Sequence, residues 1–378
     1  MKVAFFQPYL ANWRIEFLEF FIDKYTMGDV VIYDGGFGGK ADVKSVSGNN
    51  AKFKFKKLFS LSPVLKYNRQ EYPLYFSPFL FIHLLLDKPD VIVTEGEINF
   101  INNFSIYLYS RLFKKNYVWW SLGKVRTRRK NLINKLLDPF VDFLLKRSSC
   151  VMARNTLAKD YYIGSKYIQE RSVIVAPNSM NHHKESNIDH DKLASLRALK
   201  GSSKVMLYVG ALTKSKRPED LIYALKKISS NDDIKDLKLW FVGDGPERDS
   251  LQRLVDSQDL QSSVVFFGKV FEGVGNYFSI ADFVVVPGLG GLVINHAMIY
   301  GKPVVSRLAD GTELDLIEDG YTGYLVQGYE LDALVDKISL ITVSDLDLMS
   351  KRCLDKVRNH WNIDIMYERV LECIQLKL

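Results

Sequence analysis

The chain has 378 residues, of which 47% are hydrophobic, and it carries 51 Lys and Arg against 44 Asp and Glu, for a net charge of +7. This length exceeds what one ordinary hydrophobic core serves, so we expect two globular domains of about 150 to 200 residues each. The longest apolar run near the front, residues 76–86, is far shorter than the roughly 20 residues that cross a bilayer, and the N-terminus lacks a basic leader and a cleavage site, so the sequence predicts neither a membrane-spanning nor a secreted protein.

Short β-rich runs alternate with helical segments along the first half of the chain. The predicted strands span residues 2–6, 29–33, 90–94, 117–120, 150–153 and 172–176. The predicted helices between them include residues 15–21, 99–113, 131–146 and 155–162. This alternation is typical of a parallel sheet that is covered by helices on both faces.

The positive charge is concentrated in this first half. Residues 1–180 hold 27 Lys and Arg against 15 Asp and Glu, whereas residues 181–378 hold 24 against 29. Much of the excess lies in residues 52–57 and 124–137, and the second segment interleaves basic residues with Leu and Ile at helical spacing. Such a segment is either a solvated helix face or a surface that binds an anionic membrane, an anionic substrate or nucleic acid. No nucleic-acid module accompanies the charge, which favours the membrane.

We therefore expect a cytoplasmic protein that associates peripherally with the inner face of the membrane. The residues expected to contact anionic lipid are Lys124, Arg126, Arg128, Arg129 and Lys130. Three widely spaced cysteines form neither a metal pattern nor a disulfide framework, which agrees with a reducing cytosol.

A polar segment without apolar periodicity follows residue 179 and marks the expected domain boundary. The second sheet has predicted strands at residues 204–210, 237–243, 264–268, 282–287, 303–306 and 323–326. Helices are predicted at residues 218–228 and 246–255, each with a proline in its first turn. The expected domains are residues 1–180 and 181–358, followed by a C-terminal helical segment at 359–378.

Glycines follow the ends of several strands of this second sheet. They are Gly210, Gly243, Gly245, Gly268, Gly290 and Gly291. Because doubly wound sheets bind ligands outside the carboxyl ends of their strands, this pattern favours a nucleotide site. Lys214, Lys216 and Arg217 lie on the loop after the first of these strands, where cations would meet a diphosphate. The sequence has no P-loop motif, and no GxGxxG follows the first strand of the chain, which disfavours an NTPase or a dinucleotide oxidoreductase.

Motifs in a fixed order resemble the GT-B retaining glycosyltransferases, of the "glycosyl transferases group 1" type found in bacterial polysaccharide assembly, over essentially the whole chain. The motifs are PYLANWRIEFLEF (8–20), VIVTEG (91–96), VIVAPNS (173–179), YVGALTKSKRPEDLI (208–222), FVGDGPERDSL (241–251), VVFFGKV (264–270), PGLGGLVINHAMIYGKPVV (287–305) and EDGYTGYLV (318–326). The resemblance implies an α/β fold with two Rossmann-like domains facing across a cleft. It also implies a C-terminal helix that crosses back to the first domain; a helix packed on the second domain alone is the alternative.

The resemblance further implies an activity. A hexose or related sugar would pass, with retention of configuration, from a UDP- or GDP-sugar to a glycan or polyprenyl-diphosphate-linked glycan of a bacterial surface polysaccharide such as O-antigen, capsule or exopolysaccharide. No metal, other cofactor or nucleic acid is expected. A nucleotide-sugar epimerase and a non-catalytic protein that binds nucleotide sugar are the alternatives.

The second domain would bind the donor, and the first domain the acceptor. The donor contacts implied by the resemblance are Gly210, Gly243, Phe267, Gly268, Gly290, Gly291, Leu292 and His296. Lys216 and Arg217 would stabilise the departing diphosphate. Arg14 would approach both the donor phosphate and the acceptor, and its alternative is a surface salt bridge. Further acceptor contacts are expected from Glu95, Ser121 and Lys124, although helix capping or loop packing explains Glu95 equally well.

The chain departs from the pattern of the family at several site positions. Gly288 replaces the first acid of the Glu-x7-Glu motif, and His296 replaces the second. A neutral imidazole can still bond to a ribose hydroxyl, whereas a partly buried core histidine is the alternative for His296. Ala211 stands where the family often has an arginine, and WWSLGK (119–124) lacks the histidine that often contacts the transferred sugar.

Overall fold

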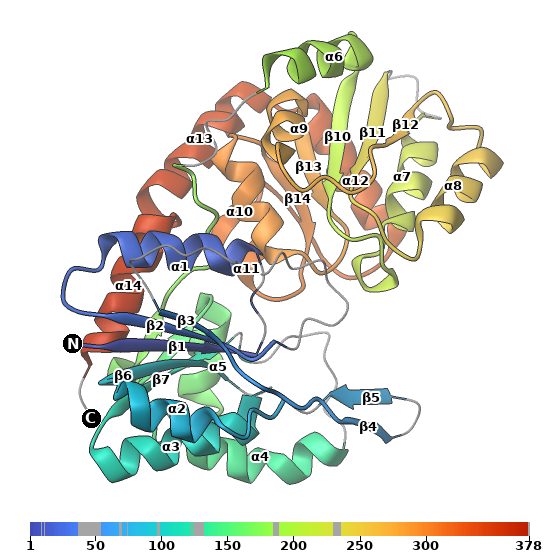
Figure 1. Ribbon diagram of the computed structural model, residues 1–378. Helices are drawn as coiled ribbons and strands as arrows, with labels where there is room; N and C mark the ends of the chain where they lie inside the picture. The colour runs from blue at the N-terminus through green and yellow to red at the C-terminus, as the bar shows by residue number, and fades with distance from the viewer. Residues whose placement is uncertain are drawn as a thin grey trace. The chain divides into compact units, whose positions relative to one another are not determined.

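The computed structural model describes residues 1–8, 10, 12–36, 54–67, 70–73, 75–96, 99–121, 123, 132–183, 189–229 and 236–376. These residues form two compact units (Figure 1). The first unit contains the described residues up to 123, those from 132 to 177, and the C-terminal segment from Ile363 onward. The second unit contains Asn178–Asn362.

The first unit is built on a seven-stranded parallel sheet with the order β3-β2-β1-β6-β7-β8-β9. Its strands are β1 (Val3–Gln7), β2 (Val30–Asp34), β3 (Lys54–Lys57), β6 (Val91–Glu95), β7 (Asn116–Ser121), β8 (Cys150–Ala153) and β9 (Val173–Val175). A separate antiparallel pair is formed by β4 (Val64–Tyr67) and β5 (Gln70–Pro73). The helices are α1 (Asn12–Lys24), α2 (Leu80–Asp87), α3 (Phe100–Phe113), α4 (Leu132–Leu145), α5 (Thr156–Gly164) and α14 (Ile363–Gln375).

Alternating side chains of these strands build two cores, one on each face of the sheet. Val3 and Phe5 of β1 belong to the core formed with α1 and α14, whereas Ala4 and Phe6 belong to the core formed with α2, α3, α4 and α5. Helix α14 contributes side chains such as Met366, so the C-terminal helix packs on the first unit. This position confirms the prediction for the end of the chain. The helix begins at Ile363, because α13 of the second unit (Leu346–His360) extends into the region where its start was predicted.

Part of the basic segment 52–57 forms an edge strand, which the sequence did not predict. Residues 54–57 are β3, and Lys56 Nζ lies 2.6 and 2.8 Å from the two carboxylate oxygens of Asp87 on α2. Charged side chains on an edge strand discourage pairing with another chain. Lys56, at least, is bound to Asp87 within the first unit.

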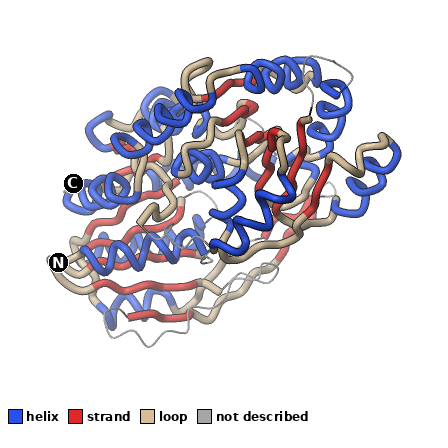
Figure 2. Tube along the Cα trace, turned by 90° about the horizontal axis from the view of Figure 1, so that it is seen from above, coloured by secondary structure: helices blue, strands red, loops and turns tan. Residues whose placement is uncertain are grey.

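The second unit contains a six-stranded parallel sheet with the order β12-β11-β10-β13-β14-β15. Its strands are β10 (Lys204–Val209), β11 (Leu237–Val242), β12 (Val264–Phe266), β13 (Phe283–Val286), β14 (Val304–Arg307) and β15 (Gly323–Val326). Its helices are α6 (His190–Lys200), α7 (Glu219–Ser229), α8 (Arg248–Ser257), α9 (Val274–Ile280), α10 (Gly291–Ile299), α11 (Thr312–Leu316), α12 (Leu331–Val343) and α13. In each unit the strands lie between helices, as predicted for a doubly wound α/β fold (Figure 2). Among the residues that the structure describes, no helix is long and apolar enough to cross a bilayer.

Candidate active site

Polar residues gather where four adjacent strands of the first unit end. Gln7 ends β1, Glu95 ends β6, Ser121 ends β7, and Arg154 directly follows β8. The strands are parallel and adjacent, so their carboxyl ends form one edge of the sheet. Ligands of doubly wound sheets bind at such an edge.

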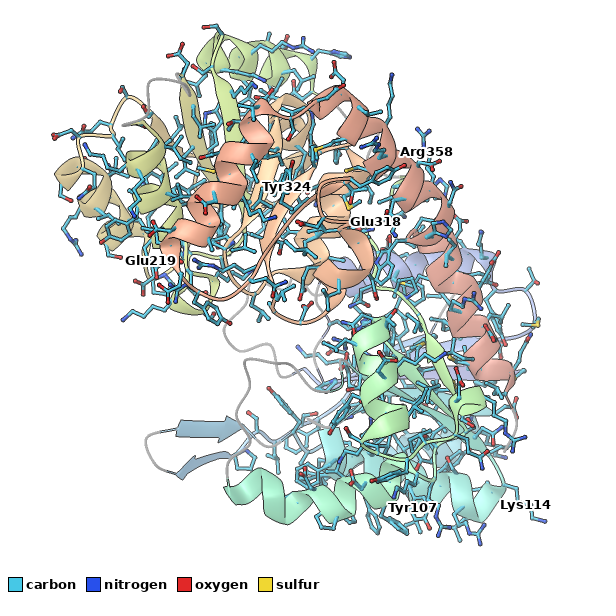
Figure 3. The ribbon with its side chains drawn as sticks, turned by 180° about the vertical axis from the view of Figure 1, so that it is seen from behind. Tyr107, Lys114, Glu219, Glu318, Tyr324 and Arg358 are labelled. Atoms are coloured by element: carbon cyan, nitrogen blue, oxygen red, sulfur yellow. The ribbon has the colours of Figure 1, made fainter. Side chains whose placement is uncertain are left out.

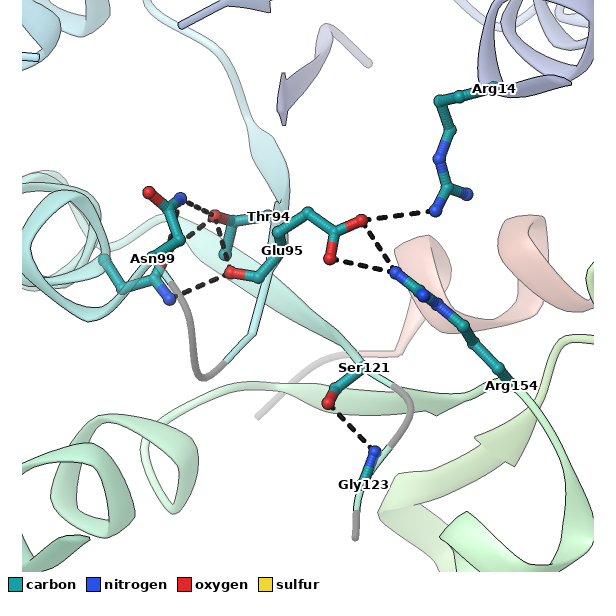
Figure 4. Close-up of polar contacts among 8 residues, drawn as sticks. Arg14, Thr94, Glu95, Asn99, Ser121, Gly123 and Arg154 are labelled. Atoms are coloured by element: carbon teal, nitrogen blue, oxygen red, sulfur yellow. Dashed lines mark hydrogen bonds and ion pairs between the residues drawn. The ribbon is translucent and has the colours of Figure 1, made fainter. Parts of the chain in front are cut away.

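Glu95 binds two arginines at this edge (Figure 4). Its carboxylate accepts hydrogen bonds from Arg154 Nη2 at 2.7 and 2.9 Å and from Arg14 Nη2 at 3.2 Å. The Arg14 guanidinium also lies over the Trp120 ring, with Cζ 3.4 Å from the ring centroid. Arg14 is only 1% exposed and Arg154 8% exposed, so both arginines are buried, and Arg14 does not form the surface salt bridge considered as its alternative.

A buried amide network fixes the backbone around Glu95. Asn103 Nδ2 donates to the carbonyl oxygens of Glu95 and Gly96, both at 3.0 Å. Thr94 Oγ1 donates to Asn103 Oδ1 at 2.6 Å and accepts from Asn99 Nδ2 at 3.3 Å. Because buried polar networks are rigid when their members are bonded, this one sets the direction in which β6 presents the Glu95 carboxylate.

Glycines allow the strand ends of the second unit to approach each other closely. Gly210 follows β10 and Gly243 follows β11, and a Cβ atom added at Gly243 would lie 1.9 Å from the Gly210 carbonyl oxygen. Gly243 also has a φ of 139°, which residues with a side chain rarely adopt. After β12, a Cβ atom added at Gly268 would meet no atom within 4 Å. The edge is tightly packed at Gly243 and open at Gly268.

Lys216 places its ammonium group at this second edge. It ends the 3₁₀ turn Lys214–Lys216 after β10, and its Nζ would lie 3.0 Å from a Cβ atom added at Gly210. Burial lowers the pKa of the Lys216 ammonium, because desolvation disfavours the charged form. A bound anion would stabilise that charged form. Lys214 of the same turn is exposed.

A buried ion pair joins this turn to neighbouring strands and loops. Arg307, at the end of β14 and 1% exposed, donates from Nη1 to Asp220 Oδ2 and, at 3.1 Å, to the Pro287 carbonyl oxygen. Its Nη2 donates to the carbonyl oxygens of residues 329 and 330 at 3.1 and 3.3 Å. Arg217 donates to the same Asp220 carboxylate from Nε at 2.8 Å and Nη2 at 3.2 Å. The Arg217 guanidinium is therefore bound to Asp220 in this structure.

Residues 191–356, which make up most of the second unit, match the family model described as glycosyl transferases group 1. The second unit belongs to this family. Curated relatives include N-acetyl-alpha-D-glucosaminyl L-malate synthase of Bacillus anthracis, which is 28% identical over 152 residues, 39% of either chain. Alpha-D-kanosaminyltransferase of Streptomyces kanamyceticus is 29% identical over 138 residues, 35% of either chain. These matches span well under half of each relative's length.

Solved structures share the fold of the whole chain. HepE from Anabaena in complex with UDP has a TM-score of 0.78 at 16% identity, covering 98% of this chain and 99% of HepE. A glycosyltransferase from Rickettsia africae has a TM-score of 0.73 at 16% identity, covering 99% of this chain and 97% of that one. The chain has the GT-B fold, as its sequence motifs predicted.

In the group 1 glycosyl transferase domain, His296 packs against aromatic rings. It lies on α10, and its ring centroid is 4.5 Å from that of Phe278 and 5.7 Å from that of Tyr300. The residue is partly exposed. Its surroundings fit the packing alternative and leave part of the residue accessible, so ribose binding by His296 stays a prediction.

The Asp310 carboxylate lies close to the start of α10. A Cβ atom added at Gly291 would lie 2.6 Å from Asp310 Oδ2, and Asp310 Oδ1 accepts from Thr312 N at 3.0 Å. Gly290 precedes this helix and Leu292 belongs to its first turn. The Asp310 charge offsets part of the positive potential of the helix N-terminus. A diphosphate at Gly291 would share this place with Asp310.

The remaining predicted contact residues have the following positions. Phe267 follows β12 and packs edge-to-face on Trp240 and Tyr277, with ring centroids 5.1 and 4.8 Å away. Ser121 is buried, and its Oγ accepts from Gly123 N at 3.0 Å. Lys124 and the other basic residues predicted to contact lipid lie outside the described residues.

Sequence reasoning missed several charged residues that lie in or beside the predicted site. Arg154 meets Glu95, Arg307 meets Asp220 beside Arg217, and Asp310 lies beside Gly291. Arg154 follows a predicted strand, and Arg307 follows another. The rule that singled out the strand-end glycines could also have found these two arginines.

Proposed function

We propose that this protein is a glycosyltransferase that transfers a hexose or related sugar from a UDP- or GDP-sugar to a glycan or polyprenyl-diphosphate-linked glycan, with retention of configuration. The observation that carries the proposal is the partly buried Lys216 side chain, whose ammonium lies beside Gly210 at the strand-end edge of a group 1 glycosyl transferase domain. The fold shared with HepE, which was solved with UDP, supports a uridine nucleotide as the first donor to test.

In the proposed reaction the bond between the anomeric carbon and the diphosphate oxygen breaks. The acceptor hydroxyl oxygen forms the new bond on the same face of the sugar, and its proton passes to the departing diphosphate. Such a reaction needs electrostatic stabilisation of the leaving group more than acid-base side chains. We propose that it proceeds without a metal or other cofactor.

Lys216 would supply most of that stabilisation. Arg217 is bound to Asp220, and the Asp310 carboxylate lies at the start of α10, so both other predicted sources of positive potential are partly compensated within the domain. A partly desolvated ammonium interacts more strongly with an anion than a fully hydrated one. The contribution of Lys216 should therefore exceed that of its exposed neighbour Lys214.

Lys216→Ala should weaken UDP binding and sugar transfer by about 1.5 to 3 kcal/mol, the usual value of a charge-assisted hydrogen bond. Calorimetric titration of UDP into the folded variant measures this loss, and Lys214→Ala is the matched control because it removes the same charge from an exposed position of the turn. Small, equal effects in both variants would remove Lys216 from the donor site. If the protein binds a UDP-sugar but transfers the sugar to no glycan, the result would support the alternative of a non-catalytic protein that binds nucleotide sugar.

We further propose that the protein acts in bacterial surface polysaccharide synthesis at an anionic membrane surface. Exposed apolar side chains on neighbouring helices of the first unit support this location; they are Ile82, Leu85 and Leu86 on α2, Phe104, Leu108, Leu112 and Phe113 on α3, and Phe140 and Phe143 on α4. Exposed basic residues on or just after these helices are Lys88, Arg111, Lys114, Lys146 and Arg147. Exposed apolar and basic residues on the same helices fit an interface that contains lipid and anionic headgroups.

A further inference from the structure

We propose that Arg154, Gln7 and Arg14 form an anion-binding subsite at the carboxyl edge of the first unit, which receives a phosphate or carboxylate group of the acceptor. This inference rests on the proposed function, because it names the chemical class of the acceptor. Every residue involved belongs to the first unit.

Strand register places these residues on one face of the sheet. Phe6 of β1 pairs with Thr94 of β6, so Gln7 and Glu95 follow side by side. Glu95 in turn pairs with Trp120 of β7, and Trp120 pairs with Met152 of β8. Arg154 lies two residues beyond Met152 and therefore returns to the same face.

Arg14 approaches this row from the helix that covers the face. It lies in the first turn of α1, which shares a core with Trp120 and Met152. Arg14 bonds to Glu95 (Figure 4), and its guanidinium lies over the Trp120 ring, so it lies over the row. The subsite thus has a floor of strand ends and a cation above it.

The described surroundings leave hydrogen-bond donors of this row without acceptors. Gln7 is 2% exposed, and no described residue accepts from its Nε2. Arg154 Nε is likewise buried without an acceptor among the described residues, since Arg154 bonds to Glu95 through Nη2 alone. Trp120, which lies under Arg14, also has a buried indole N–H with no described acceptor. Buried donors are nearly always paired, so these groups indicate a ligand that supplies acceptors.

The chemistry of the row selects an anion over a neutral sugar hydroxyl. A hydroxyl both donates and accepts, whereas these unpaired groups only donate, and Arg154 and Arg14 are cationic. A guanidinium presents parallel donors that match a carboxylate or phosphate. Glu95 supplies one carboxylate to two guanidiniums and holds both in position. Glu95 is therefore a positioning residue of the subsite.

Titration of inorganic phosphate into protein saturated with UDP tests the subsite, because UDP fills the proposed diphosphate site first. Arg154→Gln should weaken phosphate binding about tenfold or more, as expected for a lost charge-assisted bond, and should leave UDP affinity unchanged. Arg154→Lys should recover part of the affinity. Arg171→Gln is the matched control, because Arg171 is an exposed arginine of the same unit. Unchanged phosphate affinity in folded Arg154→Gln, or an equal loss in Arg171→Gln, would overturn the proposal.

Gln7→Met gives a second test that does not remove a charge. The Gln7 amide nitrogen has no acceptor among the described residues, so the variant should fold and still bind phosphate more weakly. If Gln7→Met folds and binds phosphate as the wild type does, the donor row is not a subsite. Methyl glucoside, a neutral probe, should not compete with phosphate, and competition by it would contradict the selection for an anion.

Two further probes distinguish the source of the anion. Glucose 6-phosphate carries the phosphate on a sugar, and short-chain phosphatidic acid carries it on a lipid. We expect glucose 6-phosphate to compete with inorganic phosphate in the wild type and not in Arg154→Gln. Competition by the lipid alone would support the subsite and assign its anion to the phosphate of a lipid-linked acceptor, whereas competition by neither probe would contradict an acceptor subsite. If the wild type does not bind UDP, the proposed function is rejected. The same phosphate titration without UDP then still tests the subsite, through the comparison of Arg154→Gln with Arg171→Gln.

Discussion

Gly288 lies against the turn that carries Lys216. A Cβ atom added at Gly288 would lie 2.8 Å from the carbonyl carbon and oxygen of Lys216 and from the carbonyl oxygen of Ser215. The turn backbone therefore takes the space that a side chain at position 288 would need. This contact gives a steric reason for the departure from the acidic residue of the family at this position.

Gly288→Ala should destabilise the protein by about 1 to 3 kcal/mol, as overpacking usually does, and should weaken UDP binding because the Lys216 turn must move. Denaturant unfolding and UDP calorimetry measure the two effects. Gly164→Ala is the control, since a Cβ atom at Gly164 meets nothing within 4 Å. Wild-type stability in Gly288→Ala would show that the turn adjusts at no cost.

His296 is the second departure, and its environment makes two roles testable. If its imidazole binds the donor ribose, His296→Ala should weaken UDP binding by about 1 kcal/mol or more, the value of a lost hydrogen bond. His296→Glu should recover part of that affinity, because a carboxylate also accepts from ribose hydroxyls. Calorimetry on both folded variants decides. Unchanged UDP affinity with lower stability would identify His296 as a packing residue of the Phe278 and Tyr300 cluster.

At the scale of elements, Arg307 links the end of β14 to the start of α7, the end of β13 and the loop before α12. Its Asp220 partner also binds Arg217, which follows the Lys216 turn. The Arg307 side chain bonds to Pro287, which directly precedes Gly288, and to Asp220, which binds the residue after Lys216. Arg307 therefore fixes both Gly288 and the turn that Gly288 contacts. We infer that Arg307 is a positioning residue for Lys216.

Arg307→Met should cost about 3 to 5 kcal/mol of stability, since it leaves the Asp220 charge with only part of its compensation. Arg307→Lys keeps the charge but cannot reach both the carboxylate and the carbonyl oxygens, so it should fold better and still raise the donor KM more than it lowers kcat. Arg358→Met on the exposed side of α13, labelled in Figure 3, is the control. A donor KM that stays at the wild-type value in Arg307→Lys would limit Arg307 to folding.

The sequence predicted most elements because their strands are short apolar runs ending at glycine or polar residues, as at residues 204–210 and 237–243. It missed β3, because this edge strand consists largely of lysines, and α2, whose exposed apolar residues obscure helical periodicity. The site was predicted only in part for a related reason. Glu95 meets Arg154, 59 positions later, and Asp220 meets Arg307, 87 positions later. Such pairs depend on strand order, which local periodicity does not encode.

At the scale of the whole molecule, charge and apolar exposure coincide in the first half of the chain. Residues 1–180 carry 27 Lys and Arg against 15 Asp and Glu. The exposed apolar residues of α2, α3 and α4 belong to the same unit, and Figure 1 shows these helices together on one side of its sheet. Lys114, which directly follows α3 and is labelled in Figure 3, is exposed. A membrane contact on this side would combine apolar insertion with attraction to anionic headgroups.

We therefore expect the protein to sediment with vesicles that contain phosphatidylglycerol and to bind vesicles of phosphatidylcholine alone more weakly. Each basic residue near an anionic surface contributes on the order of 1 kcal/mol, and added salt should reduce binding because it screens that attraction. Leu112→Glu should weaken binding, since it places a charge in the apolar face at an exposed position of α3. Leu348→Glu makes the same change at an exposed position of α13 in the second unit and should bind as the wild type does. Equal loss in the two variants, binding that salt does not change, or no binding at low salt would each contradict docking through α2, α3 and α4.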